Sequence, residues 1–168
     1  MPVKHGLFFA CMLITITVKA QVGPLNRIGR ETRTIDMDTG YVKLVLRNEA
    51  FRNMQKKETA SLSGLYKGDT LVKVISRIVD HESTEIMEYY FKDNELIFIY
   101  EDYKMFEPKT KNIGMIFQAR YYFNKGAMIN HISLGHGRTE GDDDFDLELL
   151  RMAHNYHRQL EAARNKQP

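Results

Sequence analysis

The chain has 168 residues, of which 24 are basic and 22 are acidic, and it contains a single cysteine. This length is sufficient for one domain with one hydrophobic core. The small excess of basic residues gives no electrostatic reason to expect nucleic-acid binding, and one cysteine excludes a disulfide within the chain.

The first 20 residues, MPVKHGLFFACMLITITVKA, have the form of a secretory signal peptide. Their apolar run of about thirteen residues is shorter than the roughly 20 that a permanent membrane span needs. The compact residues Val18 and Ala20 predict cleavage after Ala20, although Lys19 between them is unusual and leaves open a cut a few residues further on. Cys11 lies inside the apolar run and not at its close, which disfavours lipidation.

Cleavage after Ala20 changes both charge and redox chemistry. It removes Lys4, Lys19 and Cys11, which leaves 22 basic and 22 acidic residues and no cysteine. Small secreted animal domains commonly depend on disulfides. We therefore expect a periplasmic or secreted bacterial protein that binds no nucleic acid and has no membrane span after processing.

The segment 21–40 is polar and shows no sustained hydrophobic period, so it is predicted to be a mobile lead-in. A single domain is predicted over residues 41–165. Its first part, Tyr41–Lys57, fits a strand at YVKLVLRNEAF, but Leu44, Ala50, Phe51 and Met54 also fit one face of a helix. Both alternatives remain open for this segment.

The middle of the chain consists of short segments rich in β-branched and aromatic residues, which are typical of strands. These segments are Ser61–Tyr66, Leu71–Val79, Thr84–Phe91, Glu95–Tyr103, Met115–Phe123 and Ala127–Ser133. Tight turns are predicted at residues 67–70, 92–94 and 124–126, because Asn, Asp and Gly tolerate positive φ. The order of strands and turns predicts an antiparallel meander.

Alternation predicts which side of each strand is buried. Met115, Phe117, Ala119, Tyr121 and Phe123 form an apolar set. On the preceding strand, Leu96, Phe98 and Tyr100 are expected on one face and Glu101 on the other. One face of the sheet is therefore expected to pack on a core and the other to contact water.

The chain closes with a predicted amphipathic helix over residues 143–165. One stripe at spacings of four and three contains Phe145, Leu149, Ala153, Tyr156, Leu160 and Ala163. Acids gather in the first turn and bases in the last, which complements the helix dipole. The predicted fold is therefore α+β, mainly an antiparallel β-meander with this helix packed on one face.

Three segments share one pattern: GLYKGDTLVKV, YYFKDNELIFI and YYFNKGAMINH. Each places an aromatic residue before a polar turn and an aliphatic residue after it. The aromatic residues Tyr66, Phe91 and Phe123 are 25 and then 32 residues apart, whereas a repeat array needs a constant period. Hairpins of one meander therefore explain the shared pattern better than a repeat array does.

The runs EYYFKDNELIFIYE and ARYYFNKGAMINHIS, followed by the terminal helix, resemble a group of small exported bacterial proteins common in the Bacteroidetes. Those proteins carry YYF-x-x-G-x-L hairpins and have no assigned activity. The chain also resembles, more distantly, toxin-associated MORN-like repeats. It departs from both at Asn94, where Gly is usual, and at Ala127 and Met128. The resemblance implies location and architecture and brings no functional residues.

Three groups of residues resemble parts of metal or catalytic sites. Asp142, Asp144, Asp146 and Glu148 alternate as in a calcium loop, but Leu147 and Ala153 stand where an EF-hand requires Gly and Glu. His131, His136, His154 and His157 could bind a metal only if at least three of them met. Glu88, Glu101 and Asp102 could supply a carboxylate pair, but acids are expected on the water-facing side of strands.

These patterns predict no catalytic residue, no metal ligand and no cofactor, so a non-catalytic binding protein is the leading hypothesis. Its partner is expected to be a protein or glycan of the cell envelope. Exposed tyrosines beside arginine are typical of recognition surfaces. The predicted binding face comprises Tyr89, Tyr90, Tyr103, Arg120, Tyr122 and His131. The alternatives are an immunity or inhibitor protein for another envelope protein and, third, a metal-dependent enzyme.

Overall fold

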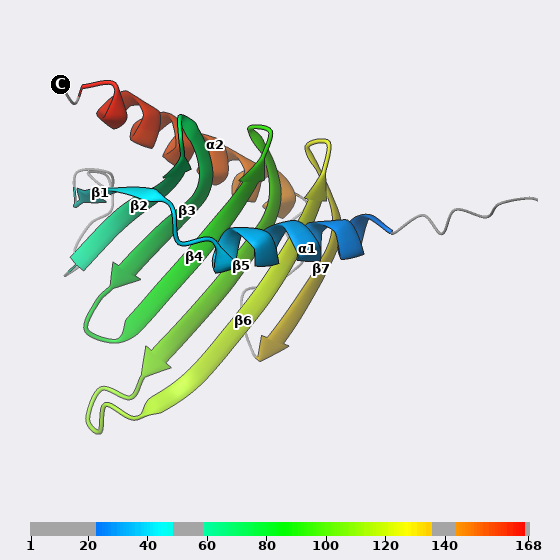
Figure 1. The fold of residues 1–168 in the computed structure, drawn as a ribbon. Coiled ribbons are helices and arrows are strands. Elements are labelled where there is room, and N and C mark those ends of the chain that lie inside the picture. The colour runs from blue at the N-terminus through cyan, green and yellow to red at the C-terminus, as the bar shows by residue number, and fades with distance from the viewer. Residues whose placement is uncertain (1–22, 49–58, 136–143, 167–168) are drawn as a thin grey trace, which may run out of the picture.

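A computed structural model of the chain describes residues 23–48, 59–135 and 144–166. Seven strands form one sheet whose spatial order follows the chain, and each strand pairs antiparallel with the next (Figure 1). The strands are β1 Val42–Arg47, β2 Thr59–Lys67, β3 Thr70–Val79, β4 Ser83–Lys92, β5 Glu95–Phe106, β6 Ile113–Asn124 and β7 Ala127–Gly135.

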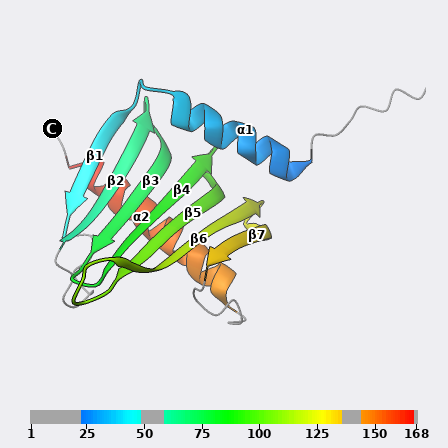
Figure 2. The same ribbon diagram turned by 90° about the horizontal axis from the view of Figure 1, so that it is seen from below.

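Two helices lie on opposite sides of this sheet (Figure 1 and Figure 2). Helix α1 spans Pro24–Met37 and helix α2 spans Phe145–Arg164. Among the residues that the structure describes, no helix is long and apolar enough to cross a membrane. The predicted antiparallel meander with a C-terminal helix on one face is confirmed.

The N-terminal part of the chain contains one helix and one strand that the sequence left open or predicted otherwise. The segment 21–40 was expected to be a mobile lead-in, and this is wrong for Pro24–Met37, which is helical. Proline suits the first helical turn, where its missing N–H is not needed. In the ambiguous segment, Val42–Arg47 is a strand, whereas Ala50, Phe51 and Met54 lie outside the described residues.

The three similar sequence segments form three hairpins that turn at the same end of the sheet. In each, the aromatic residue pairs with the aliphatic residue after the turn: Tyr66 with Leu71, Phe91 with Leu96 and Phe123 with Met128. Immediately next to each pair the register shifts, because the second strand of the hairpin contains one extra residue. Such β-bulges bend and twist a sheet. The three similar sequence segments therefore form three similar hairpins of one meander.

Positive φ angles occur in these turns, as predicted. Asp93 and Asn94 have φ of 52° and 63°, and Lys125 and Gly126 have φ of 52° and 74°. Two consecutive residues with positive φ form the type of two-residue turn that matches the twist of a hairpin. The sequence therefore specifies the turn geometry locally, without help from the rest of the fold.

The predicted alternation on β5 is wrong because of the bulge near its start. Leu96 pairs with Phe91 and Phe98 pairs with Tyr90, so Ile97 is the extra residue between them. Leu96 therefore joins the core, with Ile99 and Glu101, while Phe98 and Tyr100 point to the other face. Because of this extra residue, the side chains before it lie on the face opposite to the one that strict alternation with the later residues predicts.

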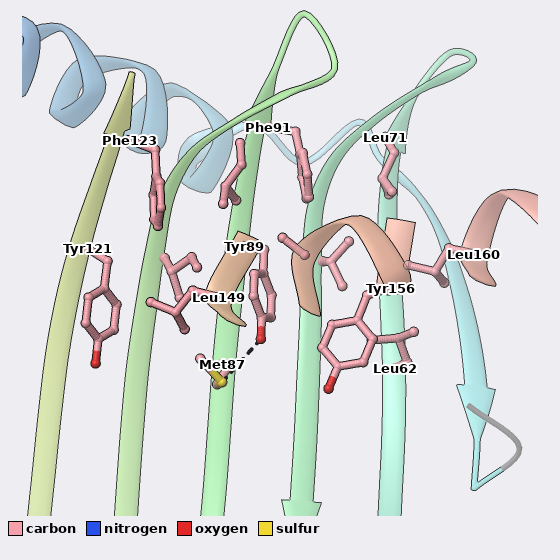
Figure 3. Packing of buried hydrophobic residues seen from close by; sticks show 14 of the residues in the cluster. Leu62, Leu71, Met87, Tyr89, Phe91, Tyr121, Phe123, Leu149, Tyr156 and Leu160 are labelled. Carbon is pink, nitrogen blue, oxygen red and sulfur yellow. Dashed lines mark hydrogen bonds between the residues drawn. The ribbon is translucent and has the colours of Figure 1, made fainter. Parts of the chain in front are cut away.

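The hydrophobic core lies between the sheet and α2 (Figure 3). The buried residues of α2 are Leu149, Ala153, Tyr156 and Leu160, four of the six that the predicted stripe contains. They contact large buried side chains of the strands, among them Leu62, Leu71, Tyr89, Phe91 and Phe123. The apolar stripe of α2 therefore covers the apolar face of the sheet, as expected.

Close contact between α2 and β2 depends on Gly64. A Cβ atom at this position would lie 3.1 Å from a side-chain carbon of Leu160 and 3.0 Å from the ring of Tyr66. Glycine thus leaves the space into which Leu160 packs. A side chain at this position would require the side chains of Tyr66, Leu71 and Leu160 to shift.

Arg164 holds the C-terminal end of α2 against the turn between β2 and β3. Its guanidinium lies 4.4 Å from the centroid of the Tyr66 ring and donates hydrogen bonds to Gly68 and Asp69. Burial raises the pKa of Tyr66 to about 12, and the carboxylate of Glu161 adds to this effect.

Replacing Leu149 with alanine should lower the free energy of unfolding by about 2–5 kcal/mol, because it leaves a cavity between α2 and the sheet. Leu147→Ala is the matched control: Leu147 is 45% exposed and Leu149 0%, so the control should change stability by less than about 0.5 kcal/mol. Urea denaturation measures both. Equal losses would contradict the assignment of the buried stripe.

The raised pKa of Tyr66 makes stability depend on pH in the alkaline range. In the unfolded chain this tyrosine ionises near pH 10, roughly its unperturbed value, whereas in the folded protein it stays neutral to about pH 12. Stability should therefore fall as the pH rises from about 10 to 12. Tyr66→Phe should show a shallower fall in urea titrations over this range, and an unchanged slope would refute the effect.

Candidate functional site

The face of the sheet opposite α2 is covered at the hairpin ends by α1 and is open to solvent beyond it (Figure 2). We call the uncovered part the open face. Cross-strand pairing defines two full rows on it: Val45, Ser63, Ile75, Glu88, Tyr100, Arg120 and Ile132, then Arg47, Ser61, Arg77, Ile86, Asp102, Gln118 and Leu134.

Helix α1 is held over the hairpin ends by polar contacts to all three hairpins. Arg27 donates a hydrogen bond to Asn124, and Glu31 pairs with Lys92 at 3.5 Å. Near the end of the helix, Asp36 accepts from Lys73. Ile28 and Ile35, which are seven residues apart, are the buried apolar residues of the helix. The helix therefore closes one end of this side of the sheet and sets the boundary of the open face.

The contact at Lys73 is the most buried of these three. Lys73 is 7% exposed, and its ammonium lies 2.8 Å from Asp36, 2.9 Å from Glu88 and 2.7 Å from the hydroxyl of Tyr90. The same ammonium lies 4.4 Å from the centroid of the Tyr90 ring. A buried charge requires such compensation, because an unpaired one is costly.

The Tyr90 hydroxyl in turn donates to one of the neighbouring carboxylates, with Glu88 at 2.8 Å and Asp36 at 3.0 Å. Burial raises the pKa of Tyr90 well above its usual value, and the carboxylates of Glu88 and Asp36 raise it further. The tyrosine therefore remains neutral, and the cluster of one cation and two carboxylates is fully hydrogen-bonded around Lys73.

A second polar group lies further along the open face. Asp102 accepts hydrogen bonds from Lys104 at 2.6 Å and from Gln118 at 3.0 Å. Burial opposes the ionisation of Asp102, but these two hydrogen bonds outweigh it and lower its pKa. Asp102 is thus ionised at neutral pH and its charge is balanced by Lys104.

The remaining charge on the open face is basic. Arg120 lies 5.5 Å from the centroid of the Tyr100 ring, and it is exposed together with Arg47 and Arg77. Within the described part of the chain, none of these three arginines pairs with a carboxylate. Since both acids of the two rows are already balanced by lysines, the open face presents three guanidinium groups beside tyrosine and aliphatic side chains.

The six residues of the predicted binding face do not form one surface. Tyr89 and Tyr103 contribute to the core on the α2 side of the sheet, and His131, paired with Tyr121, points to that side as well. Tyr90 and Tyr122 point to the other side with Arg120. Tyr89 and Tyr90 are both buried, so the expectation that one or the other lies on a water-facing surface is wrong.

Glu101 was expected on the water-facing side and is instead 1% exposed on the core side. Its carboxylate accepts a hydrogen bond of 2.9 Å from the hydroxyl of Tyr121. Figure 3 shows Tyr89, Tyr121 and Tyr156 with their hydroxyl groups pointing to the same end of the core, away from the hairpin turns. The α2 side therefore contains a polar layer at this end.

The histidines were considered as metal ligands. His157 packs against Phe91 with ring centroids 5.3 Å apart, and burial lowers its pKa. Within residues 23–48, 59–135 and 144–166, no three histidine, cysteine, aspartate or glutamate side chains come together as a metal ion would require. His136 and Asp142 lie outside these ranges. His131 and His154 are exposed on different elements.

Two parts of this arrangement were not predicted from the sequence. The first is α1, for which Pro24 and the seven-residue spacing of Ile28 and Ile35 are the available signals. The second is the cluster around Lys73, whose members come from α1, β3 and β4. Alternation along β3 places the side chain of Lys73 on the other face from that of the buried Val74. Only the tertiary structure brings Asp36 to Lys73.

Comparison of the chain with protein-family models, with curated protein sequences and with solved structures finds no match. The resemblance to small exported bacterial proteins thus stays an expectation from the sequence, and function has to be inferred from the geometry of the site.

Replacing Lys73 with methionine should lower the free energy of unfolding by about 1–3 kcal/mol, because Tyr90, Glu88 and Asp36 lose a shared donor. It should also speed amide hydrogen exchange in α1 more than in the sheet. Lys92→Met is the control, since its pair with Glu31 is exposed and contributes less than about 1 kcal/mol. Equal effects of the two variants would argue against Lys73 as the main anchor of α1.

Proposed function

We propose that the protein is an exported, non-catalytic binding protein that recognises a macromolecular partner through its open face. The observation that carries the proposal is the combination of exposed Arg77 and Arg120 with Tyr100 and aliphatic residues on a sheet face that α2 does not cover. Arginine and tyrosine are enriched at the centres of protein interfaces. The signal peptide predicted from the first 20 residues supports export.

The chemistry of the open face favours a protein partner over a small ligand. The face is a broad surface of side chains in register on several strands, whereas small ligands bind in concave pockets that surround them. Its unbalanced guanidinium groups complement carboxylates, and Ile86 and Ile132 complement apolar side chains. We therefore expect an envelope protein whose binding surface combines acidic and apolar residues.

The test is capture of a partner from envelope extract by the chain from Gln21 onward, which keeps every described residue. The double variant Arg77→Glu and Arg120→Glu should reduce the amount of bound partner at least about tenfold, which corresponds to a loss of 1.4 kcal/mol. Binding should also weaken with added salt, since exposed charges are screened.

The matched control reverses two exposed arginines of α2, Arg151→Glu and Arg158→Glu. It introduces the same change of charge on the opposite side of the molecule and should leave binding intact. Capture that survives reversal on the open face would overturn the proposal. If the captured protein is an enzyme or toxin whose activity falls on binding, the protein acts through this face as an inhibitor or immunity protein.

A further inference from the structure

A cavity of about 380 Å³ lies where helix α1 meets the turn between β4 and β5 and the turn between β6 and β7. Two polar contacts border it: the hydrogen bond of 3.1 Å from Arg27 to Asn124 and the ion pair of 3.5 Å between Glu31 and Lys92. Binding sites for small molecules usually have volumes of about 300–1,000 Å³. The cavity is therefore large enough for a small ligand.

Part of the wall of this cavity is apolar. Ile28 of α1 and Phe123 of β6 are buried in it, and Ile97 of β5 is partly exposed. Ile97 is the extra residue of the bulge near the start of β5, so the bulge places an aliphatic side chain at the cavity. The wall can therefore receive an apolar group of a ligand.

The rest of the wall is charged. Among the described residues, three basic and three acidic side chains line the cavity: Arg27, Lys92, Lys125, Glu31, Asp93 and Glu95. In the part of the chain that the structure describes, Asp93, Glu95 and Lys125 pair with no other side chain. The two acids belong to the β4–β5 hairpin and the lysine to the β6–β7 hairpin. The cavity thus has an acidic pole on one hairpin and a basic pole on the next.

The distance between these poles limits the length of a ligand that can reach both. The two turns lie at the same end of the sheet and are two strand spacings apart, which is about 10 Å because neighbouring strands lie about 4.8 Å apart. An extended peptide spans at most about 3.3–3.6 Å per residue. Two or three residues therefore reach from one pole to the other, whereas the two charged groups of a single amino acid are too close together.

We propose that this cavity binds a peptide of two or three residues with free amino and carboxyl termini. The ammonium group of the peptide lies at Asp93 and Glu95, and its carboxylate lies at Lys125. The guanidinium of Arg27 adds hydrogen-bond donors on the carboxylate side. An apolar side chain of the peptide contacts Ile97. A ligand of one charge sign is disfavoured, because it meets a like charge at one of the two poles.

The cavity is separate from the open face, so this inference does not rest on the proposed function. A bound peptide contacts α1 and two hairpins together. Because a ligand stabilises the state that binds it, the peptide should hold α1 more firmly against the sheet and slow amide hydrogen exchange in α1.

Isothermal titration calorimetry of the chain from Gln21 onward with alanyl-leucyl-alanine tests the site. The peptide with free termini should bind saturably at one site. Its N-acetylated form and its C-amidated form should each bind at least about tenfold more weakly, because each lacks one charged contact. No saturable binding of the free peptide overturns the proposal, as does equal binding of all three forms.

Two variants assign the poles. Asp93→Asn with Glu95→Gln should weaken binding of the free peptide at least about tenfold and leave the weaker binding of the N-acetylated form unchanged. Lys125→Gln should act in the same way on the free and the C-amidated forms. Asparagine tolerates the positive φ of 52° at Asp93, so the turn is kept, and circular dichroism verifies folding.

Two controls locate the binding site. Lys109→Gln removes an exposed lysine from the connection between β5 and β6, at the opposite end of the sheet, and should leave peptide binding unchanged. The open-face variant with Arg77→Glu and Arg120→Glu should also bind the peptide as the unaltered chain does. Binding that this open-face variant abolishes, or that neither pole variant weakens, overturns the proposal.

Discussion

The packing of α2 against one face of the sheet is the interaction on which the rest of the structure depends. A single helix of 20 residues covers strands from the first hairpin, at Gly64, to β6, where Phe145 contacts Tyr121. Since most of the buried apolar area lies on this side, the hydrophobic effect fixes which face of each strand points inward. The opposite face is left to be covered in another way or to contact water.

The hairpin ends connect the two sides of the molecule. Each bulge directs an aromatic and an aliphatic side chain into the α2 side at the turn, and the neighbouring residue, such as Tyr90, to the α1 side. There the sheet is closed by α1, whose small apolar contribution of Ile28 and Ile35 is supplemented by ion pairs. Lys73 matters most among these, because its charge is buried and has to be balanced.

The core and the proposed binding surface thus lie on opposite sides of the sheet. Residues on the α2 side cannot be changed without cavities or strain, whereas the open face can vary with little effect on the fold. Its three exposed arginines are therefore available for the binding that we propose.

The sequence alone determined the antiparallel meander, its turns and the buried stripe of α2, because these depend on local φ preferences and on hydrophobic period. It did not determine on which face Glu101 and Leu96 lie, since one extra residue, Ile97, reverses alternation and leaves no local signal. The site was harder still. Tyr89 and Tyr90 are adjacent and chemically alike, but they point to opposite faces. One of the two carboxylates that neutralise Lys73 belongs to Asp36, 37 residues away. Such contacts between distant segments form only when α1 folds onto the hairpins, so the tertiary structure decided them.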